Sequence, residues 1–134
     1  MPAAGGQAVQ VTKDGGYVVQ ESPDGRFVYY SKAGTIPLGL WRVPPSGGEE
    51  TEVLPSVTFL NFAVIGNGIY YIPRADDGRY FLKFFSFLTG KISPIAALNG
   101  KYGNGLTVSP DGKTLLYTQI DQHGSDLMLV DSFR

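Results

Sequence analysis

A five-residue segment that occurs twice constrains this chain more than any other feature. Residues 22–26 (SPDGR) recur as residues 109–113 (SPDGK), and the two copies start 109 − 22 = 87 positions apart. Half of that separation, about 44 positions, predicts an intermediate copy near residue 65, where residues 64–68 (VIGNG) stand without the Pro and the Asp. A fixed period of about 20–50 residues is typical of repeat architectures. We therefore expect three related units.

Each copy precedes segments rich in β-branched and aromatic residues, which favour strands. These segments are residues 27–30, 69–72 and 114–117, then 40–43, 82–85 and 127–130, then 52–54 and 92–95. Pro94 cannot donate a hydrogen bond to a neighbouring strand, which suits an outer edge strand. With a first strand ahead of each turn, the units are predicted to contain up to four short strands.

The SPDG segment is predicted to be the turn between the first two strands of its unit. Pro23 presets φ for the second turn position, Asp24 can accept a hydrogen bond from its own backbone, and Gly25 tolerates positive φ. Because apolar segments flank the turn, it indicates a β-hairpin.

Four short strands in about 44 residues match one blade of a β-propeller. Immunoglobulin-like sandwiches also contain many short strands, but they do not repeat at this period. Glycine and proline interrupt nearly every window long enough for a helix. The expected fold is all-β: a β-propeller segment of three four-stranded antiparallel blades.

The period also predicts the boundaries of the units. We expect blade 1 at residues 16–55, blade 2 at 56–98, and blade 3 at 99–134 without its outer strand. Residues 7–12 match residues 49–54, the outer strand of blade 1, so residues 1–15 are expected to supply an outer strand to another blade.

Three blades alone cannot form a ring, since propellers have about four to eight blades. We expect two chains to close a six-bladed ring as a homodimer, with residues 7–12 of each chain completing blade 3 of the other. The alternative is that the chain is a piece of a longer propeller.

The segments 21–30 (ESPDGRFVYY) and 108–117 (VSPDGKTLLY) resemble the TolB-like, WD-type propeller repeat. Residues 124–131 (GSDLMLVD) resemble the last blade of bacterial proteins that carry such repeats. The resemblance covers nearly the whole chain and implies the propeller fold. It also implies a non-catalytic scaffold that binds a protein or peptide on its channel face.

Composition excludes several classes of function. The formal net charge is −1 with scattered basic residues, which argues against nucleic-acid binding. There is no cysteine, hence no disulfide and no thiolate site. Residues 1–6 lack the pattern of a signal peptide and no apolar run could span a membrane, so we expect no membrane association. We expect a cytoplasmic location for the chain as given. If it is a piece of a longer family member, we expect a periplasmic location.

The chemistry-bearing residues do not form a catalytic motif. The single histidine, His123, lies beside Asp121 in a predicted loop, and one histidine without cysteine argues against zinc. Asp76 and Asp77 stand in an Asp-Gly turn with too few oxygen ligands for calcium. No catalytic residue, metal or cofactor is expected.

In a propeller, the long loops gather at one end around the channel, and loops on a rigid scaffold commonly bind. The residues predicted to contact a ligand or partner there are Asp14, Tyr17, Arg74, Asp76, Arg79, Tyr102, Asn104, Asp121 and His123. The expected function is binding of a protein or peptide. The alternatives are a small-molecule or sugar-sensing module of a bacterial regulator and a carboxylate-based hydrolase or lyase.

Overall fold

The computed structural model describes residues 4–32, 34, 36–75 and 77–120, which form ten strands without a helix. The first sheet contains β1 (Gly16–Glu21), β2 (Val28–Lys32), β3 (Leu38–Val43) and β4 (Thr51–Val57). The second contains β5 (Phe62–Ile65), β6 (Gly68–Tyr71), β7 (Tyr80–Ser86) and β8 (Ile92–Leu98). The third pairs β9 (Lys101–Val108) with β10 (Leu115–Ile120).

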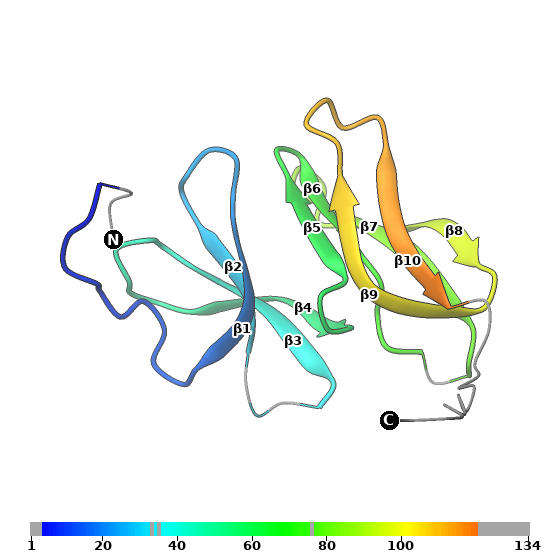
Figure 1. The fold of residues 1–134 in the computed structure, drawn as a ribbon, viewed down its shortest axis with the longest axis horizontal. Helices are drawn as coiled ribbons and strands as arrows, with labels where there is room; N and C mark the ends of the chain where they lie inside the picture. Colours follow the sequence, from blue (N-terminus) through cyan, green and yellow to red (C-terminus); the bar gives the residue numbers. More distant parts are fainter. Residues whose placement is uncertain (1–3, 33, 35, 76, 121–134) are drawn as a thin grey trace, which may run out of the picture.

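In all three sheets, consecutive strands pair antiparallel. The sheet β1–β4 lies at the left of Figure 1, and the sheets β5–β8 and β9–β10 lie at the right. The all-β prediction is confirmed, as is the placement of Pro94 on an edge strand, because within the described residues β8 pairs only with β7. The strand predicted at residues 127–130 lies outside the described residues. Within them, no helix is long and apolar enough to cross a membrane.

Both SPDG turns adopt the predicted geometry. Ser22 Oγ donates to Asp24 Oδ1 at 2.6 Å, and the same oxygen accepts the Arg26 N–H at 3.1 Å. The Phe27 N–H donates to Ser22 Oγ at 3.0 Å, and Gly25 has φ 68°. The second turn repeats each of these bonds 87 positions later, and its Gly112 has φ 70°. The shared geometry explains why this segment recurs in the sequence.

The apolar core occupies two layers between the three sheets. Tyr29, Leu40, Leu54, Val57, Phe62, Ile69 and Tyr71 fill the layer between the first and second sheets. Ala63, Ile72, Leu82 and Leu106 fill the layer between the second and third sheets. Neighbouring residues of β5 face opposite layers, because side chains alternate along a strand: Phe62 packs against the first sheet and Ala63 against the third.

Two side-chain amides join the sheets at their first strands. The Gln20 amide donates to the Phe62 carbonyl at 2.8 Å and accepts the Val64 N–H at 3.0 Å. The fully buried Asn61 amide donates to the Gly103 carbonyl at 3.0 Å and accepts the Gly105 N–H at 3.1 Å. Each amide thus satisfies the edge of the next sheet's first strand, the edge that pairs with no strand in the described residues. We call these contacts amide clamps.

Replacing Asn61 by alanine should lower the free energy of unfolding by about 3 kcal/mol. The change leaves the partly buried Gly103 carbonyl and Gly105 N–H without partners, and each unsatisfied group of this kind costs about 1–3 kcal/mol. Urea unfolding followed by tryptophan fluorescence measures the effect. Asn67→Ala, in the exposed turn between β5 and β6, is the matched control and should change stability little. Equal midpoints for the two variants would contradict the clamp's importance.

Candidate binding site

A cleft of about 460 Å³ opens at the end of the sheets where the loops β2–β3, β4–β5 and β6–β7 emerge. Its lining is mainly apolar: Ile36, Pro37, Leu38, Val57, Thr58, Phe59, Arg74 and Tyr102. Two of the residues predicted from the sequence to bind, Arg74 and Tyr102, therefore lie in one cleft although 28 positions separate them. We call it the loop-end cleft.

A tight turn between β4 and β5 presents Phe59 to the loop-end cleft. The Asn61 N–H donates to the Thr58 carbonyl at 3.1 Å, and Leu60 adopts φ 62°. Thr58 is anchored by its N–H and its hydroxyl, both of which donate to the Ile72 carbonyl at 2.8 Å. Phe59 is left 44% exposed by this geometry.

Aromatic contacts hold the two tyrosines of the predicted set. Tyr17 meets Phe59 edge to face with ring centroids 6.4 Å apart, so it borders the loop-end cleft from the first sheet. Tyr102 meets Tyr80 in the same geometry at 4.7 Å. Such pairs fix the orientation of both rings. The walls of the cleft consequently combine side chains from strands of the first and third sheets with side chains from the β2–β3, β4–β5 and β6–β7 loops.

The surface of the loop-end cleft combines exposed apolar groups with one cation. Ile36 is 85% exposed, and Arg74 is exposed on the loop after β6. The Arg74 backbone N–H donates to Ser56 Oγ at 3.2 Å, which fixes the start of that loop while the guanidinium stays at the surface. This arrangement can hold an apolar side chain next to a carboxylate, and among the described residues that line it no nucleophile is paired with a base.

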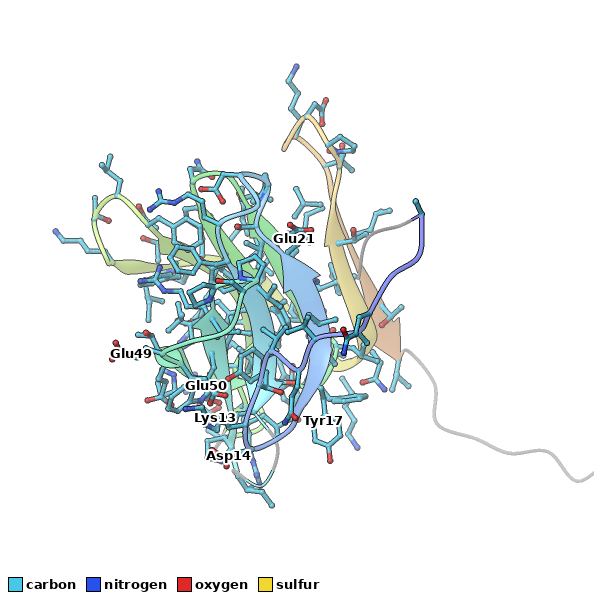
Figure 2. The ribbon with its side chains drawn as sticks, turned by 90° about the vertical axis from the view of Figure 1, so that its left-hand side faces the viewer. Lys13, Asp14, Tyr17, Glu21, Glu49 and Glu50 are labelled. Atoms are coloured by element: carbon cyan, nitrogen blue, oxygen red, sulfur yellow. The ribbon has the colours of Figure 1, made fainter. Side chains whose placement is uncertain are left out.

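Asp14, another predicted residue, belongs to a charge cluster on the outer face of the first sheet. Lys32 Nζ lies 2.6 Å from Glu50 Oε2, 3.5 Å from Asp14 Oδ2 and 4.3 Å from the centre of the Trp41 ring. Figure 2 shows Lys13, Asp14 and Glu50 gathered at one end of this face, with Glu21 farther up. The Lys13 N–H also donates to Glu50 Oε1 at 2.9 Å.

The hydrogen bond from Lys32, helped by the Lys13 N–H, lowers the pKa of Glu50 to about 2. The same hydrogen bond raises the pKa of Lys32. Burial, followed by the nearby negative charge of Glu50, raises the pKa of the Tyr30 phenol. At neutral pH the cluster therefore holds a fixed ion pair whose two charges largely cancel.

Two further predicted residues, Arg79 and Asn104, do not line the loop-end cleft. Arg79 pairs with Asp77 at 2.6 Å within its own loop, and Asn104 is exposed on β9. Asp76, Asp121 and His123 lie outside the described residues. Among the residues that the structure describes, no three histidine, aspartate or glutamate side chains gather as a metal site would require.

The sequence reasoning missed a second cleft, of about 800 Å³, at the opposite end between the first two sheets. Its walls include the SPDG turn, Phe27, Tyr29, Arg42 and Phe87. The Arg42 guanidinium lies 4.4 Å from the centre of the Phe27 ring, and its buried Nε finds no acceptor among the described residues. The one signal of this cleft in the sequence was Arg42, a charged residue in an otherwise apolar predicted strand. We call this second cleft the turn-end cleft.

No family model matches this sequence, and no curated protein is significantly similar to it.

Glu50→Gln should reduce stability near neutral pH and have a progressively smaller effect below about pH 4.5. A carboxylate whose pKa falls on folding stabilises the fold above its unfolded pKa, near 4.5, and loses that contribution as the pH approaches 2. Urea unfolding of the wild type and the variant from pH 7 to pH 2.5 measures the difference. Glu49→Gln, at the exposed neighbour, is the matched control. A stability difference between the wild type and Glu50→Gln that stays constant with pH would contradict the assignment.

Proposed function

We propose that this chain is a non-catalytic propeller scaffold that binds a protein segment in the loop-end cleft. The observation that carries the proposal is the exposed apolar wall of Ile36, Pro37 and Phe59 beside the Arg74 guanidinium. Surfaces of this kind mark interaction sites, because isolated soluble domains seldom leave apolar groups clustered in water. The cleft suits a segment that carries an apolar side chain next to an acidic one.

Propeller geometry is supported by the order of the sheets. Each sheet is a sequential antiparallel meander, and the first strands β1, β5 and β9 are neighbours across the sheets. The amide clamps join these same first strands. Blades around a common axis have this arrangement, with the first strand of each blade innermost.

Ring closure by a second copy is part of the proposal. Val19 is 68% exposed on the outer face of the first sheet, and Leu116 is 65% exposed on the outer face of the third. Packing these faces in a two-fold head-to-tail pair gives six blades, within the usual range of about four to eight. Residues 7–12, which form no strand in the single chain, would then become the outer strand of the partner's third sheet.

Light scattering at micromolar concentration should give a mass of 2 × 14.5 = 29.0 kDa. Leu116→Asp should return the protein to the monomer mass, because it places a charge in the middle of an apolar contact. Leu88→Asp, at an exposed turn between β7 and β8, is the control and should stay dimeric. A wild-type monomer at all concentrations would overturn ring closure.

A random peptide library displayed on phage tests the loop-end cleft. We expect the enriched peptides to share an apolar residue next to Asp or Glu. Ile36→Asp and Arg74→Ala should each weaken binding of a selected peptide by about tenfold or more, since both remove contacts at the centre of the site. Leu88→Asp should bind normally, because Leu88 is equally exposed at the opposite end. Peptides that bind Ile36→Asp unchanged would contradict the assignment.

Small-molecule sensing is a second candidate, favoured by the turn-end cleft. Arg26 and Arg42 both line it together with Asp24 and Glu52, and neither arginine is within ion-pair distance of a carboxylate in the described part of the chain. Guanidinium groups above an aromatic wall suit a planar anion. Titration calorimetry with benzoate and with inorganic phosphate, on the wild type, on Arg42→Gln and on the control Arg79→Gln, decides the case. Binding that Arg42→Gln leaves unchanged, or no binding at all, would exclude this candidate.

A further inference from the structure

The amide clamp of Asn61 follows a rule that can be extended to the open ends of the sheets. Asn61 lies four residues before Ile65, the last residue of β5 paired with β6. On the next sheet it binds the carbonyl of Gly103 and the N–H of Gly105, which lie five and three residues before Val108, the last paired residue of β9. The Asn61 clamp is thus defined by positions counted from the ends of the two hairpins. The Gln20 clamp uses other positions, because Gln20 lies one residue before Glu21 and binds Phe62 and Val64, three and one residues before Ile65.

Asn104 occupies on β9 the position that Asn61 occupies before β5. It lies four residues before Val108, whose pairing with Leu115 ends the β9–β10 hairpin. Its side chain is exposed and carries the same carboxamide group as Asn61. An asparagine here is therefore equipped to clamp a further sheet packed on the outer face of β9–β10.

The backbone groups that such a clamp would bind are present on β1. Gly16 and Val18 lie five and three residues before Glu21, whose pairing with Val28 ends the β1–β2 hairpin. Both first strands are irregular at this place: the register of β1 shifts between Tyr17 and Val19, and that of β9–β10 shifts between Tyr117 and Gln119.

The two irregularities share an unusual backbone conformation. Val18 has φ 48° and Gly105 has φ 127°, both positive. A positive φ is unfavourable for a β-branched residue such as valine, so this conformation must be enforced by its surroundings. Both first strands thus depart from extended geometry at the residue that lies three positions before the last pair of the hairpin, Val18 in β1 and Gly105 in β9.

We propose that Asn104 of one copy clamps the Gly16 carbonyl and the Val18 N–H of a second copy, and that the reciprocal contact forms at the other junction of the ring. The inference rests on the proposed six-bladed dimer and specifies its contact. Six sheets joined in this way are held by six amide clamps, four within the chains and two between them. Each first strand then has a carbonyl and an N–H of its unpaired edge bound by a side-chain carboxamide of the preceding sheet.

Asn104→Ala tests the contact by sedimentation equilibrium. Loss of two clamps, with four hydrogen bonds in total, should raise the dimer dissociation constant by about a hundredfold or more, since each net hydrogen bond contributes about fivefold. Asn67→Ala, an exposed asparagine at the β5–β6 turn, is the matched control and should leave the constant unchanged.

Amide hydrogen exchange adds a readout that a general loss of stability would not imitate. In the wild-type dimer the Val18 N–H should be protected, and in Asn104→Ala it should exchange fast at a concentration where the variant is still dimeric. A wild-type dimer whose Asn104→Ala variant associates equally tightly, with Val18 protected, would overturn the clamp and leave ring closure standing. A wild type that is monomeric at every concentration would overturn both.

Discussion

The structure depends on how the first strand of each sheet satisfies its unpaired edge. A backbone edge buried between packed sheets must find partners, because an unpaired N–H or carbonyl there costs about as much as several favourable contacts contribute. Gln20 and Asn61 solve this with one carboxamide each, which supplies both a donor and an acceptor to the neighbouring strand. The sheets are therefore held in register by polar contacts as well as by the apolar layers.

Asn61 links this constraint to the candidate site. Besides clamping β9, its side chain donates to the Phe59 carbonyl at 3.1 Å, and its backbone N–H closes the turn on Thr58. One buried residue consequently fixes both the third sheet and the turn that presents Phe59 to the loop-end cleft. The shape of that cleft and the packing of the second and third sheets therefore both depend on Asn61.

The sequence predicted the local structure well, because turns and strands follow from nearby residues. The SPDG segments encode their own hydrogen bonds, and Pro94 identified an edge strand. Arg74 and Tyr102 lie in one cleft, and the assumed order of strands had already placed both residues in loops at the same end of the sheets. The amide clamps and the Arg42–Phe27 contact could not be predicted, since each joins residues whose meeting depends on sheet packing or cross-strand register.

The outer face of the first sheet can be covered by a neighbour without burying an unpaired Lys32 or Glu50. Its Lys32 and Glu50 are already paired at 2.6 Å with side chains that are 16% and 10% exposed, so most of their desolvation cost is incurred within the single chain. Covering this face would then bury the apolar surface of Val19 at little additional electrostatic cost. Asp14, still 74% exposed, is the charge in this cluster that a covering sheet would have to accommodate. A neighbour that packs here must therefore either leave Asp14 at the rim in water or bring a cation to it.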